Sequence, residues 1–101
     1  MIEIEVVLEE GDVGRAMERA ADALGLTIAG DGSLHKYSGS RHWHLKRGNS
    51  AGTLEATYWP SGARFWVCCH ANRIGDGWVL SAAPRLAEAL SVALRAEEGD
   101  R

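Results

Sequence analysis

Two histidines separated by one residue, His42 and His44, are the side chains of this sequence best placed to do chemistry. In an extended strand, side chains two positions apart share a face, so both imidazoles would point the same way. If neighbouring strands bring Glu55 and Cys68 beside them, the group contains ligand types that zinc accepts. Structural zinc sites usually also show cysteine pairs at turn spacing, which this sequence lacks. We therefore predict no bound metal and interpret the histidines as solvated or paired with Glu55.

The two cysteines, Cys68 and Cys69, are adjacent, so in a strand their side chains point to opposite faces and a bond between them is strained. We expect reduced thiols, as in a cytoplasmic protein. Cys68 with His44 or His70 would be a possible nucleophile and base. Cysteines that pack are commoner than catalytic ones. We therefore predict no catalytic residue and no cofactor, and we favour a binding protein over an enzyme.

Residues 35–73 differ in composition from the rest of the chain. They contain six Lys and Arg against the single acid Glu55, all four histidines and three of the four tryptophans, although the whole chain carries a net charge of −3. Tryptophans for base stacking and arginines for phosphates are the composition of a sheet that binds single-stranded nucleic acid. Exposed aromatic and Arg side chains are equally typical of protein interfaces. The pI of about 5.7 favours the protein interface.

Apolar periodicity and turn residues predict five strands and two helices. Asp12 is a suitable N-cap and Gly25 a suitable stop for the first helix, and Pro84 is tolerated in the first turn of the second. The expected elements are a strand over residues 1–8, a helix over 13–24, extended structure over 26–29 with a turn or bulge at 30–32, strands over 41–46, 53–59 and 64–71, a loop over 72–77 and a helix over 84–97. This order, β-α-β-β-β-β-α, indicates an α+β two-layer sandwich with a mostly antiparallel sheet and both helices on one face.

Alternation divides the three central strands into two sets of side chains. The apolar set is expected under the helices and consists of Trp43, Leu45, Leu54, Ala56, Tyr58, Phe65, Val67, Cys69 and Ala71. The other set contains the candidate binding face, which consists of His42, His44, Lys46, Trp59, Arg64, Trp66 and His70. If the strands pair as hairpins, the outer face carries the rows His44/Glu55/Cys68, His42/Thr57/Trp66, Lys46/Thr53/His70 and Trp59/Arg64.

From Asp12 onward, the helix-strands-helix order resembles the α-β-β-β-α arrangement of double-stranded-RNA-binding domains and of HicA-type messenger-RNA interferases. The interferases carry a Gly-Ser-His element, and the similar text here is Gly39-Ser40-Arg41-His42, in which an arginine precedes the histidine. The resemblance implies ribonuclease activity with His42 or His44 as the catalytic base.

We expect a single domain over residues 1–101, frayed from about residue 98, that is cytoplasmic and does not enter a membrane. Its expected function is that of a small non-catalytic binding module acting through the open face of its sheet. The partner would be a second copy or another protein. The alternative is an RNA- or DNA-binding module, and a more remote one a HicA-like ribonuclease.

Overall fold

The computed structural model describes residues 2–70 and 77–99. Most of the predicted loop after the last strand, including Arg73, therefore lies outside the described residues, as do the last two residues. The elements in chain order are β1 (Ile2–Glu5), α1 (Val13–Ala23), β2 (Thr27–Gly32), β3 (Arg41–Lys46), β4 (Leu54–Trp59), a short 3-10 helix (Pro60–Gly62), β5 (Arg64–Cys69) and α2 (Trp78–Gly99). This order confirms the predicted α+β class.

The five strands form one sheet in the order β1-β5-β4-β3-β2, and all neighbours are antiparallel. Leu45 pairs with Leu54 and Tyr58 with Phe65, as predicted, so three of the four expected outer rows are confirmed by the register. In the fourth row, Thr53 and His70 lie just beyond the strand ends. The sequence left the position of β1 open, and the structure places it at the edge beside β5.

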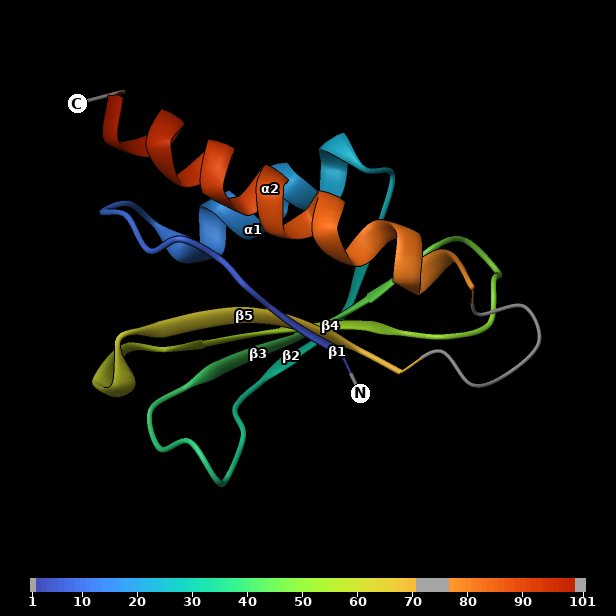
Figure 1. Cartoon of the computed structure of the whole chain (residues 1–101), viewed down its shortest axis with the longest axis horizontal. Helices are drawn as coiled ribbons and strands as arrows, with labels where there is room; N and C mark the ends of the chain where they lie inside the picture. The colour runs from blue at the N-terminus through green and yellow to red at the C-terminus, as the bar shows by residue number, and fades with distance from the viewer. Residues whose placement is uncertain (1, 71–76, 100–101) are drawn as a thin grey trace.

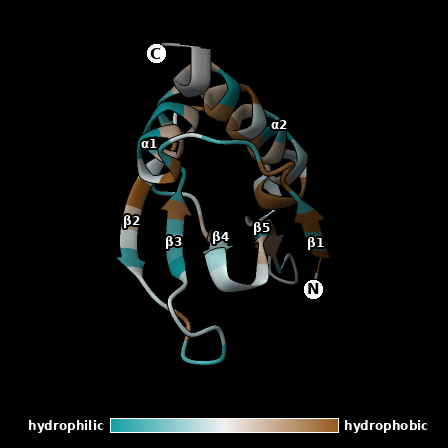
Figure 2. Cartoon of the chain, turned by 90° about the vertical axis from the view of Figure 1, so that its left-hand side faces the viewer, coloured by the Kyte–Doolittle hydropathy of each residue, from teal (hydrophilic) through white to brown (hydrophobic). Residues whose placement is uncertain are grey.

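Both helices cover the same face of the sheet, which we call the inner face (Figure 1; Figure 2). Asp12 caps α1 as predicted, since its side chain accepts a hydrogen bond from the backbone N–H of Arg15. The core lies between the layers and includes Met17, Trp43, Leu45, Leu54, Ala56, Phe65, Val67, Leu86, Leu90 and Leu94, all almost fully buried. The predicted apolar set of the central strands is therefore confirmed where it is described.

The start of the second helix is the main error of the sequence prediction. The helix begins at Trp78, and Pro84 lies inside it. An internal proline costs about 3 kcal/mol or more through a lost hydrogen bond and a clash. Burial of Trp78 and Val79 offsets this cost, since each large apolar side chain contributes roughly 1.5–3 kcal/mol. The Trp78 indole N–H also donates to the carbonyl of Ala51 at 2.7 Å.

The connection between β2 and β3, residues 33–40, lies on the side of the sheet opposite the helices (Figure 1). The buried hydroxyl of Ser40 holds this connection together, because it accepts a hydrogen bond from the Leu34 N–H at 3.0 Å. The backbone adds turns in which Tyr37 N–H donates to the Leu34 carbonyl and Ser40 N–H to the Tyr37 carbonyl. The connection is therefore a compact loop against the outer face of the sheet.

In the described part of the chain, no helix is both long and apolar enough to cross a membrane. Both cysteines are free thiols, as expected, and both are buried.

Candidate functional site

The outer face of the sheet has two parts. The loop 33–40 covers the first part and only borders the second. We call the first part the tryptophan end, and it consists of Trp59, Arg64 and Trp66 with Tyr37 of the loop. We call the second part the histidine pocket, and it is lined by Gly30, Asp31, Gly32, Ser33, Leu34, His42, His44 and Glu55.

The loop covers the tryptophan end. The ring of Tyr37 lies 5.0 Å from the rings of both Trp59 and Trp66, measured between centroids. The Trp59 indole N–H donates to the carbonyl of Ser38, and a Cβ on Gly62 would overlap the Trp59 ring. Trp66 is only 2% exposed. The expected open face is thus closed here by the chain itself, and Trp66 offers almost no surface to a partner.

Arg64 is also engaged within the chain. Its Nε donates to Glu5 at 2.6 Å and its Nη2 to Glu3 at 2.9 Å, and its guanidinium carbon lies 4.0 Å from the centroid of Trp66. The two glutamates raise the pKa of Arg64 above its ordinary value through these hydrogen bonds. The acidic edge strand β1 therefore neutralises the arginine that the sequence offered for phosphate binding.

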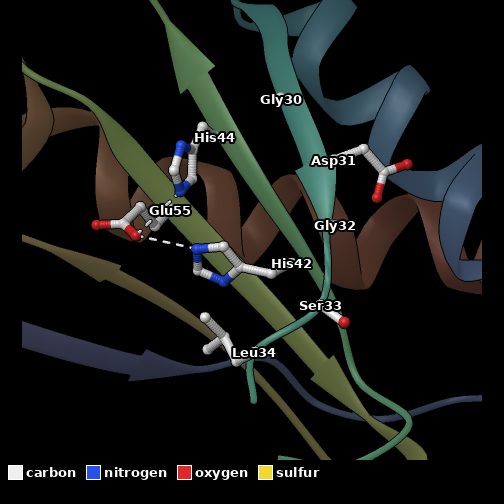
Figure 3. Close-up of a pocket in the computed structure, with 8 residues that line it drawn as sticks. All are labelled: Gly30, Asp31, Gly32, Ser33, Leu34, His42, His44 and Glu55. Atoms are coloured by element: carbon white, nitrogen blue, oxygen red, sulfur yellow. Dashed lines mark hydrogen bonds and ion pairs between the residues drawn. The ribbon is translucent and has the colours of Figure 1, made fainter. Parts of the chain in front are cut away.

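The histidine pocket has a volume of about 390 Å³ and lies over β3 and β4 beside the glycines of β2 (Figure 3). Nε2 of His42 lies 2.9 Å and Nε2 of His44 lies 3.4 Å from the same carboxylate oxygen, Oε1 of Glu55. The side chain of His42 is 9% exposed and that of His44 is 51% exposed. Two imidazoles thus converge on one carboxylate, and one of the imidazoles is accessible.

Two glycines leave room for this pocket. In the pairing of β2 with β3, Gly30 faces His44 and Gly32 faces His42, with a register shift after Ile28. The prediction of a turn or bulge at residues 30–32 is wrong in position, because Gly30, Asp31 and Gly32 pair regularly with β3 and the irregularity lies between Ile28 and Gly30. Directly paired residues point to the same face of a sheet, and a Cβ at position 30 would contact the side chain of His44, whereas a Cβ at position 32 would meet open space. Glycine in a strand often marks a place where a ligand approaches the backbone.

Thr57 completes a chain of contacts behind the pocket. Its hydroxyl lies 2.7 Å from Nδ1 of His42, whose Nε2 contacts Glu55. Hydroxyl, imidazole and carboxylate in this order are the groups of a nucleophilic triad. Thr57 has no exposed surface, however, so its hydroxyl cannot reach a substrate. The hydroxyl instead fixes the orientation of the His42 ring.

Cys68 shares the row of His44 and Glu55, as predicted. Burial, with smaller contributions from the charges of Glu55 and Glu3, raises the pKa of the Cys68 thiol to about 11. A reactive cysteine needs a lowered pKa, because the thiolate is the nucleophile. Within the described residues, the group whose donor atoms could share a metal consists of His42, His44 and Glu55, without Cys68.

The other predicted site residues lie around the pocket or beyond it. Lys46 is half-buried and donates to the Gly52 carbonyl at 2.7 Å and to the Thr53 hydroxyl at 3.2 Å. His70 is exposed beyond the end of β5. Arg41, a possible phosphate contact, pairs with Asp31 at 3.2 Å. The cations that would bind nucleic acid are thus largely occupied, as far as the structure describes them.

Sequence reasoning missed the five pocket residues Gly30, Asp31, Gly32, Ser33 and Leu34, and also the role of Thr57 behind the pocket. Thr57 was assigned to the correct row but given no role. The glycines carried a usable signal, because their spacing of two matches that of His42 and His44. The position of Leu34 had no such signal, since it depends on how the loop folds back.

Comparison with protein-family models, with characterised proteins and with solved structures finds no match. The resemblance to RNA-binding domains and interferases therefore remains one of element order. Of the two histidines it singles out, His42 has both ring nitrogens in hydrogen bonds and His44 is half exposed.

Proposed function

We propose that this protein is a small non-catalytic binding module whose binding site is the histidine pocket. The observation that supports this proposal most strongly is the convergence of two imidazoles on Glu55 in a pocket of about 390 Å³. Concave sites with a few convergent polar groups are the usual form of a ligand site. The partner is another protein, or a second copy of this chain, that inserts a polar group into the pocket.

The alternatives have less support. The buried hydroxyl of Thr57 and the protonated thiol of Cys68 speak against nucleophilic chemistry. The ion pairs of Arg41 and Arg64 speak against an extended phosphate-binding surface. A binding site centred on Trp66 would require the loop 33–40 to open.

Site-specific photo-crosslinking tests the proposal. A photoreactive phenylalanine derivative is placed at position 33, because Ser33 lines the pocket and is exposed but is not one of its convergent polar groups. In a control protein it is placed at position 92, because Val92 is also exposed but lies on α2. We expect discrete crosslinked protein species from position 33 alone. Twice the mass of the chain would identify a second copy.

A pocket-filling variant provides the matched control. A Cβ on Gly30 would make only ordinary contacts with His44, so Gly30→Leu adds a side chain over the pocket without displacing the backbone. We expect it to abolish the crosslink from position 33. The same species from position 92, or none from position 33, would contradict the proposal, and a nuclease-sensitive species would favour the nucleic-acid alternative.

A further inference from the structure

We propose that His42, His44 and Glu55 bind a divalent transition-metal ion of the zinc type in the histidine pocket. This inference rests on the proposed function in one respect, namely that it uses the same pocket. The donor atoms of the three side chains all lie within 4.8 Å of one another. They come from neighbouring positions of two rigid strands, because His44 pairs directly with Glu55.

Two of the three spacings between donor atoms are close to those around a tetrahedral ion. Ligand atoms about 2.0–2.1 Å from zinc lie roughly 3.4 Å apart. The two imidazole nitrogens lie 2.9 Å and 3.4 Å from the Glu55 oxygen, and all the donor atoms lie within 4.8 Å of one another. Binding of an ion therefore requires the side chains to adjust, and His44 has room to do so because half of its side chain is exposed.

Thr57 supplies the outer hydrogen bond that metal-bound histidines usually have. A histidine that binds metal through Nε2 must carry its proton on Nδ1, and a partner of Nδ1 fixes this tautomer. The Thr57 hydroxyl oxygen lies 2.7 Å from Nδ1 of His42 and can accept a hydrogen bond from Nδ1–H. Because a hydroxyl can also donate, the same contact is satisfied when no ion is bound and Nε2–H donates to Glu55.

The donor set selects the class of ion. Two imidazole nitrogens and one carboxylate oxygen suit zinc and its neighbours, whereas calcium and magnesium prefer sites made of oxygen. Three protein ligands leave a coordination position for water or for an incoming group. The glycines at positions 30 and 32 keep this space clear, so the open position faces the pocket and a partner's polar side chain could fill it.

Isothermal titration calorimetry of the untagged, chelator-washed protein with Zn²⁺ tests the inference. We expect one ion per chain, and at least tenfold weaker binding by His44→Ala and by Glu55→Gln. We also expect Thr57→Val to weaken binding roughly 10–100-fold, as outer partners of metal ligands do. His35→Ala is the matched control, because His35 is an exposed histidine outside the group, and it should bind as the unchanged protein does.

Three results would overturn the inference: no stoichiometric Zn²⁺ binding, an unchanged affinity in His44→Ala, or Ca²⁺ binding as tight as Zn²⁺ binding. Circular dichroism of each variant shows whether the fold is retained, and Glu55→Gln keeps size and hydrogen bonding if His44→Ala does not fold. Crosslinking from position 33 in the presence of a chelator separates the two proposals. If that crosslink forms but Zn²⁺ does not bind, only the metal inference fails. If Zn²⁺ binds but no crosslink forms, only the proposal of a protein partner fails.

Discussion

The two parts of the outer sheet face differ in how their polar and aromatic groups are satisfied. At the tryptophan end, Tyr37 packs on both tryptophans and Arg64 is held by two glutamates, so the groups meet their partners within the chain. At the histidine pocket, Gly32 and Gly30 pair with His42 and His44 and add no side chain beside the imidazoles. The same period-2 pattern produced both parts. Alternation in the sequence therefore predicts which face of the sheet a residue lies on, but it does not predict whether another part of the chain covers that face.

Removing the central ring of the tryptophan end should have the largest effect on stability. We expect Trp66→Ala to lower the free energy of unfolding by about 3–5 kcal/mol, because the ring is buried. His44→Ala, at the open part, should change it by less than about 0.5 kcal/mol. Urea denaturation measures both values. Equal effects of the two variants would remove the distinction between the two parts.

The thiol beside the pocket should react slowly in the folded protein. In a Cys69→Ala background, Cys68 is the only thiol. Because burial raises its pKa from 9.0 to about 11, we expect alkylation at pH 8 to be roughly 100-fold slower than in urea, since each pH unit changes the thiolate fraction tenfold. Equal rates in the folded and unfolded protein would restore Cys68 as a candidate nucleophile.

The raised pKa of Cys68 also sets the direction in which stability changes with pH. The folded state holds the proton of Cys68 more tightly than the unfolded state does. Its contribution to stability is therefore complete below about pH 9 and is lost as the pH rises toward 11. Denaturation curves of Cys68→Ala should show a smaller decline over this range, and an identical decline would contradict the prediction.

Removing the Tyr37 ring from the tryptophan end should lower the free energy of unfolding by less than Trp66→Ala does. Tyr37→Ala removes two ring contacts, each worth about 0.5–1.5 kcal/mol. We expect a loss of about 1–3 kcal/mol and stronger quenching of tryptophan fluorescence by acrylamide. Tyr37→Phe keeps the ring and should resemble the unchanged protein. Unaltered quenching in Tyr37→Ala would mean that the loop does not cover the tryptophans.

Within the tryptophan end, the smallest effect on stability is expected from the ion pairs of Arg64. Partly exposed pairs contribute about 0–1 kcal/mol, so Arg64→Ala should cost under about 1 kcal/mol. Most of this difference should disappear in 1 M salt, where the Debye length is about 3 Å. A double-mutant cycle with Glu5→Gln measures the coupling, and a coupling of zero would show that stacking on Trp66 alone holds Arg64.

Much of the fold followed from local patterns. The sequence predicted β3, β4, the register between them and the N-cap at Asp12. These features were predictable because alternation, turn residues and capping act over a few residues. The start of α2 was not, because the burial of Trp78 against distant residues outweighs the local penalty of Pro84. Tertiary packing overrode propensity there.

The candidate site was predictable in part. The row of His44 and Glu55 followed from geometry, and the structure adds that His42 turns toward the same carboxylate. The closure of the tryptophan end was not predictable, because it depends on hydrogen bonds within the loop, such as that of Ser40 with Leu34. Sequence analysis therefore assigned the side chains of the central strands to the right faces but did not predict that the loop covers the tryptophans.

The central claim is that ligands enter the outer face at the histidine pocket and not at the tryptophan end. The most direct test is a ¹H–¹⁵N correlation spectrum recorded with and without Zn²⁺, which serves as the probe. We predict shifts of the backbone amides of residues 30–34, 42–44 and 55, with the indole N–H signals of Trp59 and Trp66 unchanged. Shifts of those indole signals without shifts of the pocket amides would contradict the claim.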